Sequence, residues 1–318
     1  MGGITVLFQQ LLARSDISKV KYFKYIDNSN VLNSQVNAVS VDNRCLERYR
    51  DFQFKVDEGD IFHSTYYRLP TFKTNVITTV HDFTYEKFVK GLPKAVHTWQ
   101  KYRAINNSNH IICVSHNTAM DLQYYCNVSS DKISVIHNGV ASEYVPLNLE
   151  HTDSVLFVGS RIGYKNFDVA INALALSNKF RLNIVGSPLG KKEIQILEAK
   201  LPKRYTYLGK LTNIELNVEY NRAYALLYPS SYEGFGIPAI EAMSAGCPVI
   251  AINNSSLPEV VGSAGILLDS AEANLIHEAL LSLENIRPDL VRSGYVQAKK
   301  FSWDQCYTET VNVYKKFL

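Results

Sequence analysis

Two glutamates flank a glycine-rich stretch in the second half of the chain. Glu233 and Glu241 are separated by seven residues, and Gly234 and Gly236 follow the first of them. Glycine has no Cβ, so the backbone at these positions can turn sharply and approach a ligand closely. A helix that starts here adds the positive end of its dipole, and the two carboxylates can accept hydrogen bonds from hydroxyl groups. The stretch therefore predicts a seat for a phosphate or a sugar.

The residues on either side indicate the elements that hold this loop. Apolar runs at residues 223–229 and 247–252 are typical of strands buried in a parallel sheet. Between them, Pro238 suits the first turn of a helix and Gly246 suits the left-handed position after its end, which predicts a helix over residues 238–245. Ligands of open α/β sheets bind beyond the carboxyl ends of the strands, where both glutamates would lie. Taken singly, either glutamate is equally well explained as a helix-dipole partner or a solvated loop residue.

The whole string is much more specific than its parts. Residues 230–249 have the pattern S-x-Y-E-G-F-G-I-P-x-x-E-A-M-x-x-G-x-P-V, which closely resembles the E-x7-E signature of retaining GT-B glycosyltransferases, in particular glycosyltransferase family 4. The resemblance implies that Glu233 lies beside the transferred sugar and that Glu241 binds the ribose hydroxyls of a nucleotide. It also implies that the donor is held by the amides of the intervening residues, which are Gly234, Phe235, Gly236 and Ile237.

Two cations follow the first strand expected in this half of the chain. Arg161 and Lys165 lie in the loop G-S-R-I-G-Y-K-N, directly after an apolar run at residues 154–159. A guanidinium fork and an ammonium group suit a diphosphate and would stabilise the charge that grows on a leaving nucleoside diphosphate. Two loop cations alone are more often surface residues, but this loop resembles the phosphate-binding loop of the family.

The same resemblance assigns residues that follow the next strands. Gly186 ends one strand, and Leu208 with Gly209 ends another, so these three residues would border the base of the nucleotide. Glu259 comes after the strand at residues 247–252. It would either touch the nucleotide or simply start a helix.

A histidine and an aspartate come directly after a predicted strand in the first half of the chain. His81 and Asp82 follow the run at residues 75–80 and would lie at the carboxyl edge of a sheet, as a hydrogen-bonding or acid–base pair. Alternatively, the pair only caps the next segment. The sequence H-D-F-T-Y-E-K-F resembles the family's motif that faces the donor sugar and the acceptor. We expect structural roles for the other histidines, which are His63, His97, His110, His116, His137, His151 and His277.

The first residues contain a further glycine pair. Gly2 and Gly3 precede apolar positions at helical spacing, so they either form a phosphate seat at a helix start or are merely the start of the chain. The pattern resembles the donor-facing glycine-rich loop in the N-terminal domain of the family, where a β-strand comes first. That strand is central in a doubly wound sheet. We therefore expect that the first strand is missing here and that residues before Met1 supply it in the natural protein.

The composition excludes several classes of protein. The chain has 318 residues, 46% of them hydrophobic, which predicts two domains with substantial cores. A net charge of +3 and the lack of a recognisable binding module argue against a nucleic-acid partner. The five cysteines are scattered without metal-ligand spacing, which fits a reducing cytoplasm and argues against a metal site. No apolar run reaches the roughly 20 residues that a membrane helix needs, and no signal peptide is visible.

Residues 87–103 form a basic and aromatic stretch in which only Glu86 opposes the positive charge. Such a stretch is able to rest on an anionic surface, here the inner face of the cytoplasmic membrane. More often it is a solvated helix face over a core stripe. Its basic residues are Lys87, Lys90, Lys94, Lys101 and Arg103.

Two successive series of strands and helices predict two Rossmann-like α/β domains. An irregular linker at residues 137–153 separates the series, and we expect domains at residues 1–147 and 148–302. The sequence also predicts a final helix at residues 303–318, and the resemblance implies that this helix crosses back onto the first domain. The resemblance implies the GT-B fold, in which the two domains face a central cleft. In the first domain the patterns predict strands at residues 20–26, 61–64, 75–80, 110–115 and 132–136 and helices at 42–54 and 117–125.

The resemblance also implies an activity. We expect a metal-independent enzyme without a cofactor that transfers a sugar, with retention, from a UDP- or GDP-linked donor to a hydroxyl of a glycan or a polyprenyl-diphosphate-linked acceptor. Synthesis of a bacterial surface polysaccharide, O-antigen or capsule, is the expected setting. The alternatives are a GT-B sugar-nucleotide epimerase and a catalytically inactive subunit that binds nucleotide sugars. A GT-A transferase and a dehydrogenase are disfavoured, because no strand is followed by D-x-D or by a complete G-x-G-x-x-G.

Overall fold

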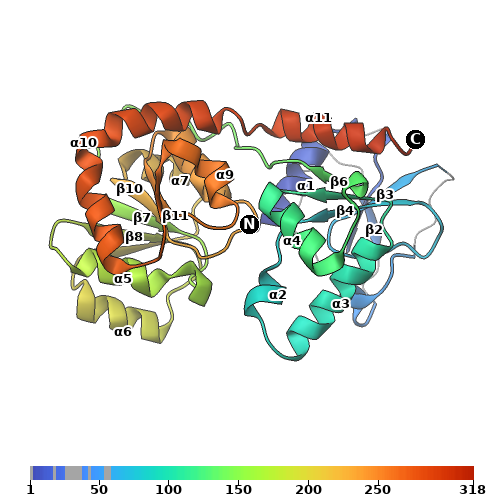
Figure 1. The fold of residues 1–318 in the computed structure, drawn as a ribbon, viewed down its shortest axis with the longest axis horizontal. Coiled ribbons are helices and arrows are strands. Elements are labelled where there is room, and N and C mark those ends of the chain that lie inside the picture. The colour runs from blue at the N-terminus through green and yellow to red at the C-terminus, as the bar shows by residue number, and fades with distance from the viewer. Residues whose placement is uncertain (1–2, 17–18, 26–37, 42–43, 54–58) are drawn as a thin grey trace. The chain divides into compact units, whose positions relative to one another are not determined.

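The computed structural model describes residues 3–16, 19–25, 38–41, 44–53 and 59–318 (Figure 1). The chain forms two compact units, of which unit 1 comprises Met1–Gly139 and Ser302–Leu318 and unit 2 comprises Val140–Phe301. The segment at residues 140–147, expected in the first domain, bonds within unit 2. There the backbone N–H of Val145 donates to Asn217 Oδ1 at 3.1 Å.

Unit 2 is built on six parallel strands in the order β12-β11-β10-β7-β8-β9. The strand order reverses between β7 and β10, which makes this a doubly wound sheet of the Rossmann type. All four residues of β10 and all four of β11 are buried, as expected for central strands covered on both faces. The strands are β7 (Ser154–Val158), β8 (Arg181–Val185), β9 (Tyr205–Gly209), β10 (Ala225–Tyr228), β11 (Val249–Ile252) and β12 (Ile266–Leu268).

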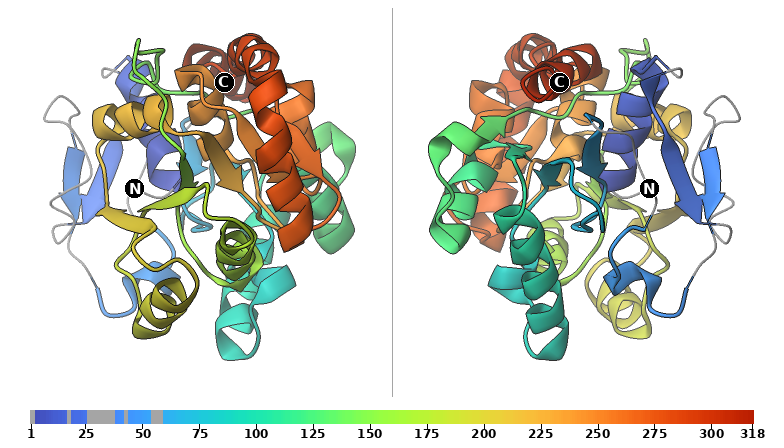
Figure 2. Two further views of the ribbon diagram at one scale, coloured as in Figure 1. Left: turned by 90° about the vertical axis from the view of Figure 1, so that its left-hand side faces the viewer. Right: turned by 90° about the vertical axis from the view of Figure 1, so that its right-hand side faces the viewer.

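Helices cover this sheet and close its core. The expected helix at residues 238–245 is α8, and Gly246 after it is left-handed with φ 82°. Its alanines Ala239 and Ala242 are fully buried, and the long α10 packs against α8. The same helix also packs against α5 (Figure 2). The helical elements are η4 (Gly163–Lys165), α5 (Phe167–Ala175), α6 (Lys191–Lys200), α7 (Asn213–Arg222), α8 (Ile237–Ala245), α9 (Leu257–Val261), η5 (Gly262–Ala264) and α10 (Ala273–Ala298).

Unit 1 contains a four-stranded parallel sheet in the order β3-β4-β5-β6 and a separate parallel pair, β1 and β2. The expected strands at residues 61–64 and 75–80 are confirmed to the residue. The strands are β1 (Tyr22–Tyr25), β2 (Ala38–Val41), β3 (Ile61–Ser64), β4 (Asn75–Val80), β5 (His110–Cys113) and β6 (Ile133–Val135). The helices are α1 (Gly3–Arg14), η2 (Glu47–Tyr49), α2 (Thr84–Phe88), α3 (Leu92–Asn106), α4 (His116–Cys126), η3 (Ser130–Lys132) and α11 (Trp303–Tyr314).

The first and last helices of the chain pack together in unit 1 (Figure 1). Leu7 and Leu11 of α1 share a buried cluster with Trp303 of α11 and with Ile77 of β4. Burying each such side chain contributes about 1.5–3 kcal/mol. An ion pair of 2.6 Å between Arg14 and Asp304 joins the ends of the two helices.

The helix expected at residues 42–54 is wrong for the part that the structure describes. Within residues 44–53 the one helical turn is η2. The backbone of Phe52 instead bonds to another segment, because its N–H donates to the Leu69 carbonyl at 2.8 Å and its carbonyl accepts from the Thr71 N–H at 2.9 Å. These long-range bonds use the groups that a helix would pair locally, so tertiary contacts override the local pattern.

Candidate active site

The most distinctive group of side chains in unit 2 lies where the strand order reverses. Strands β7 and β10 are neighbours, and the loops after both leave the carboxyl edge of the sheet. The loop after β7 carries Lys165 in η4, and the loop after β10 carries Glu233. Ligands of doubly wound sheets bind in the crevice at such a reversal.

Lys165 and Glu233 form an ion pair at this edge of the sheet. Their side chains are 13% and 12% exposed, so the pair is mostly shielded from water. The Lys165 ammonium lies 5.2 Å from the ring centre of Tyr164 and 5.6 Å from that of Tyr228. Burial and the negative charge of Glu233 raise the pKa of Tyr228, which hydrogen-bonds to Glu233 and remains neutral. The pair is thus framed by two aromatic rings.

The loop between β10 and α8 has the backbone that its glycines predicted. Gly236 has φ 107° and immediately precedes α8, while Pro238 occupies the first turn of that helix. This φ disfavours any residue with a side chain, and a Cβ at Gly236 would in addition lie only 3.0 Å from Leu257 Cδ2. Phe235 is buried and packs edge-on against Phe301, with 5.6 Å between ring centres. The amides at the start of α8, which include Ile237, form the positive end of the helix.

Glu241 lies in α8, and two tyrosines hydrogen-bond to its carboxylate. The Tyr220 hydroxyl donates to Glu241 Oε2 at 3.1 Å, and Tyr144 also hydrogen-bonds to this carboxylate. Burial raises the pKa of Glu241 to about 7, although both hydrogen bonds act to lower it. Neither tyrosine was singled out in the sequence, because they are 21 and 97 positions away and no local pattern connects them with Glu241.

Arg161 is held by a carboxylate of its own unit. Its Nε lies 2.7 Å from Glu193 Oε1, and its Nη2 donates to the carbonyls of Ser187 and Pro188 at 2.8 and 2.9 Å. The bound Arg161 helps to keep the pKa of Glu193 below its ordinary value, despite burial. Arg161 Nη1 is buried and has no hydrogen-bond partner among the residues that the structure describes. The Nε and Nη2 atoms of the guanidinium are therefore held by protein acceptors, whereas Nη1 is available to a ligand.

Three neighbouring strands of unit 2 end in glycines with positive φ. These are Gly159 after β7 with 116°, Gly186 after β8 with 147° and Gly209 at the end of β9 with 75°. A Cβ at Gly186 would lie 2.5 Å from the Gly159 carbonyl oxygen, so only glycine fits there. Leu208 precedes Gly209 and is half-buried. Because these glycines have no side chains, a ligand at this edge of the sheet can approach the backbone closely.

Two further residues expected in the site, Glu259 and Gly3, lie in the first turns of the helices α9 and α1. Glu259 is in the first turn of α9 and is half-buried. Gly3 is the first residue of α1, which confirms the helix expected after it. Gly2 lies outside the described residues.

His81 and Asp82 directly follow β4 at the carboxyl edge of the unit 1 sheet. Burial lowers the pKa of His81 to about 4, and the charge of Lys101 adds to this effect while Asp82 opposes it. The imidazole is therefore neutral at pH 7. Its Nε2 is buried without a partner in the described parts of the chain. Asp82 Oδ1 accepts from the Thr84 N–H at 2.9 Å, so the capping role considered for the pair is present at Asp82.

A fully buried ion pair supports this segment. Lys101 Nζ lies 3.1 Å from both carboxylate oxygens of Glu86 and donates to the Asp82 carbonyl at 2.5 Å. The ammonium also lies 3.7 Å from the ring centre of Phe83. The sequence suggested an exposed Lys101 because it lies within a run of basic residues, but in the structure it is fully enclosed.

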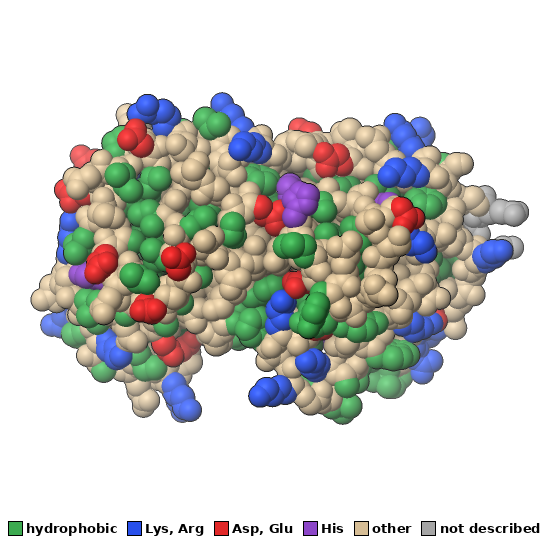
Figure 3. Space-filling model, viewed as in Figure 1, with side chains coloured by type: hydrophobic (Ala, Val, Ile, Leu, Met, Phe, Trp, Pro, Cys, Tyr) green, Lys and Arg blue, Asp and Glu red, His purple; other side chains and the backbone are tan. Residues whose placement is uncertain are grey.

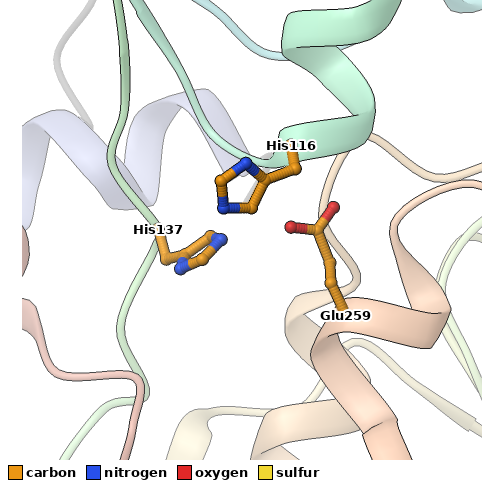
Figure 4. Close-up of side chains that lie close together, drawn as sticks. All are labelled: His116, His137 and Glu259. Atoms are coloured by element: carbon orange, nitrogen blue, oxygen red, sulfur yellow. The ribbon is translucent and has the colours of Figure 1, made fainter.

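The other histidines of unit 1 include one pair at the same sheet edge. His116 begins α4 after β5, and His137 follows β6, with 5.7 Å between their ring centres (Figure 4). Glu259, the third residue labelled in Figure 4, belongs to unit 2. His63 is half-buried and bonds to Thr79 Oγ1 at 2.8 Å. Burial of its ring, with a smaller effect from His81, lowers its pKa to about 3. A signal for the His116–His137 pair existed in the sequence, since both follow predicted neighbouring strands.

The basic stretch over α2 and α3 carries less unpaired charge than its sequence suggests. Lys87 pairs with Asp121 at 2.9 Å, and Arg103 pairs with Asp51 at 2.5 Å. Apolar side chains are nevertheless exposed between the cations (Figure 3), with Leu92 at 75% and Trp99 at 58%. Among the described residues, no helix is both long and apolar enough to cross a membrane.

Solved structures similar to this chain share its fold. WaaG, a glycosyltransferase involved in lipopolysaccharide biosynthesis, matches with a TM-score of 0.76 and 14% identity, over 98% of this chain and 96% of WaaG. Anabaena Alr3699/HepE in complex with UDP-glucose matches with a TM-score of 0.63 and 16% identity, over 76% of this chain and 72% of that one. The expectation of two parallel-sheet, Rossmann-like domains is thereby confirmed.

Two curated proteins with similar sequences are bacterial mannosyltransferases. The O-antigen chain mannosyltransferase B of Escherichia coli is 29% identical over 85% of this chain and 76% of its own length. The O-antigen chain mannosyltransferase RfbU of Salmonella typhimurium is 30% identical over 76% of this chain and 69% of its own length.

Two family descriptions match successive parts of the chain. Residues 43–144 match Glycosyltransferase Family 4, and residues 146–300 match Glycosyl transferases group 1. The second match contains the whole strand, loop and helix arrangement around Lys165, Glu233 and Glu241. Together with the relatives above, these matches show that the chain belongs to the family 4, or group 1, glycosyltransferases.

Proposed function

We propose that this protein transfers a sugar from a nucleotide-sugar donor to a hydroxyl of a glycan or lipid-linked acceptor, with retention at the anomeric carbon. The observation that carries the proposal is the Lys165–Glu233 pair at the sheet reversal, beside the glycine-rich start of α8. A sugar linked to a diphosphate needs both a positive field for the phosphates and a carboxylate for its hydroxyls, and this crevice offers both.

Unit 2 is assigned to the donor. Glu241 receives the ribose hydroxyls, and the amides of the loop that contains Gly234 receive phosphate or sugar oxygens. The glycine edge at Gly186 and Gly209 borders the base, where exposed backbone allows close approach. Arg161 offers its remaining Nη1 to the diphosphate while Glu193 fixes the rest of the guanidinium.

The proposed reaction follows from these positions. The bond between the anomeric carbon and the diphosphate oxygen breaks, and Lys165 with the start of α8 stabilises the negative charge that appears on the leaving group. The acceptor hydroxyl attacks from the same face, forms the new glycosidic bond and gives its proton to the departing diphosphate. Glu233 orients the sugar through its hydroxyls. His81, neutral at pH 7, and Asp82 are assigned to the acceptor as hydrogen-bonding groups.

The proposed setting is bacterial surface polysaccharide synthesis in the cytoplasm. The curated relatives named above are O-antigen mannosyltransferases, and a similar solved structure holds UDP-glucose, so GDP-mannose and UDP-glucose are the first donors to try. All five cysteines are free, which fits a reducing compartment. A polyprenyl-diphosphate-linked glycan is the proposed acceptor, reached by peripheral contact of the α2–α3 surface with an anionic membrane.

One experiment separates this function from its rivals. The protein is incubated with GDP-mannose or UDP-glucose, with and without membrane extract as the acceptor source, and released nucleoside diphosphate and labelled product are measured. Transfer that depends on the acceptor, with an α-linked product from an α-linked donor, supports the proposal. An isomerised donor without acceptor would indicate an epimerase, and a calorimetric signal for UDP or GDP without turnover would indicate a binding subunit.

A further inference from the structure

Two consecutive serines of unit 2 hold the main chain of Glu233. The hydroxyl of Ser255 accepts from the Glu233 N–H at 2.9 Å, and the hydroxyl of Ser256 donates to the Glu233 carbonyl at 3.0 Å. Ser256 also lies 2.7 Å from the Phe235 carbonyl, so its one proton is shared between two acceptors. Both backbone polar groups of Glu233 are thus bonded to side chains of a different loop.

The sheet explains why this loop is in reach. Strand β10 lies between β7 and β11, so the loop after β10 has the loops of both neighbours beside it. On the β7 side, Asn166 Nδ2 donates to the Pro229 carbonyl at 2.7 Å and to Ser231 Oγ at 2.8 Å. On the β11 side, Ser255 and Ser256 hydrogen-bond to the backbone of Glu233 and Phe235. The carboxylate of Glu233 is consequently aimed from a backbone that is fixed on two sides.

Ser255 also has an unusual backbone. Its φ is 53°, a left-handed conformation that glycine or asparagine adopts more readily than serine. The Ser255 N–H is bonded to Asn254 Oδ1 at 2.7 Å, which supports the turn. A serine at a left-handed position carries a conformational cost that glycine would avoid. Here its hydroxyl accepts from the Glu233 N–H, which glycine would leave without this partner. Ser256 is fully buried, so its hydroxyl bonds to the protein and not to solvent.

We propose that Ser255 and Ser256 are positioning residues, which hold the backbone of Glu233 so that its carboxylate meets the donor sugar. This role rests on the proposed function, because it acts through Glu233. Neither serine is needed to bind the nucleotide, and their loss is expected to lower turnover more than donor affinity.

The informative variant is Ser255→Gly, because glycine suits the left-handed backbone and lacks the hydroxymethyl side chain that bonds to the Glu233 N–H. We expect an unchanged or higher melting temperature, about tenfold slower release of nucleoside diphosphate from GDP-mannose or UDP-glucose, and a donor KM within about threefold of the original. Ser255→Asn, which tolerates the same backbone and carries an acceptor oxygen, is expected to restore most of the rate. The matched control is Lys203→Gly, at an exposed left-handed residue with φ 60° between α6 and β9, which should leave turnover unchanged.

Hydrogen exchange at the Glu233 amide tests the same contact without any activity. Ser255→Gly should speed this exchange about tenfold, and Ser255→Asn should slow it again, while Lys203→Gly should not affect it. If no donor is turned over by the unchanged protein, the proposed function fails and the exchange rates still decide whether the serine holds Glu233. The positioning role would be overturned if Ser255→Gly kept both the amide exchange rate and the turnover of the unchanged protein. It would also be overturned if the Lys203→Gly control lost as much turnover as Ser255→Gly.

Discussion

Lys165 and Glu233 stand 68 positions apart in the sequence and meet as a shielded ion pair beyond the carboxyl ends of β7 and β10. Neither charge would be stable there alone, since a partly buried charge without its partner is costly. The ion pair satisfies both groups. We infer that the donor enters by sharing these charges, with the phosphates drawing on Lys165 and the sugar hydroxyls on Glu233.

The two glutamates should therefore give separable defects. Glu241→Ala is expected to weaken binding of UDP or GDP about tenfold to a hundredfold, because a charged partner of the ribose is lost. Glu233→Ala should leave this binding nearly intact, since it frees Lys165 for the phosphates, but should cut turnover strongly. Calorimetric titration beside a transfer assay measures both effects. Equal loss of nucleotide affinity in the two variants would contradict the assignment.

Nucleotide binding should depend on pH through Glu241. Burial raises its pKa to about 7, and the ionised carboxylate is the stronger acceptor for ribose hydroxyls. Affinity for UDP or GDP is thus expected to increase as the pH rises from about 6 to about 8, across the titration of this group. Glu241→Gln should flatten the profile, and a profile of the same steepness in that variant would show that another group titrates.

The carboxyl group of Glu241 should also make stability depend on pH. Nucleotide affinity is expected to rise with pH, whereas the free energy of unfolding is expected to fall. The ordinary pKa of this carboxyl is 4.5, so between this value and about 7 the folded protein holds a proton that the unfolded chain has released. The free energy of unfolding should accordingly fall as the pH rises through this window and level off above it. Urea unfolding of the ligand-free protein and of Glu241→Gln, compared at several pH values, measures the difference.

Transfer should survive chelation. Lys165, Arg161 and the start of α8 can together supply the positive field that a metal ion would otherwise provide to the diphosphate. The test is turnover in EDTA, with added magnesium as the comparison. A complete loss of transfer that magnesium or manganese restores would refute this prediction.

The buried Lys101–Glu86 pair should behave as a coupled unit. Lys101→Met is expected to destabilise the protein by about 3–5 kcal/mol, because Glu86 is left as an unpaired buried charge. Adding Glu86→Leu should recover most of this loss. The control is Arg103→Ala on the same helix, whose pair with Asp51 is partly exposed and should be worth less than about 1 kcal/mol. Denaturant unfolding that shows no recovery in the double variant would argue against the coupling.

The proposed membrane contact of the α2–α3 surface should depend on apolar side chains more than on charge. Leu92→Ser with Trp99→Ser is expected to abolish co-sedimentation with vesicles that contain phosphatidylglycerol, since both side chains are exposed. Ile214→Ser, an exposed apolar residue of unit 2, is the control. Because Lys87 and Arg103 are already paired, moderate salt should weaken binding only slightly, and complete release by salt would show an electrostatic attachment instead.

Local sequence signals were sufficient for the elements around the site. The apolar runs predicted β10 and β11, and the positions of Pro238 and Gly246 predicted α8 within one residue. These signals succeed because burial on both faces of a strand, and the backbone limits of proline and glycine, act over a few neighbouring residues. Over the described residues 44–53 the expected helix failed for the complementary reason, since the backbone of Phe52 bonds to Leu69 and Thr71.

The partners of the site residues were decided by the tertiary structure. The types and spacing of Lys165, Glu233 and Glu241 indicated phosphate and sugar chemistry, but nothing near them in the chain indicated their contacts. Strand order placed the loop of Lys165 beside that of Glu233, and helix packing placed Tyr220 against Glu241. An isolated residue type specifies which charge or hydrogen bond is available. Which group receives it, and at what pKa, depends on segments that meet only when the sheet has formed and water has been excluded.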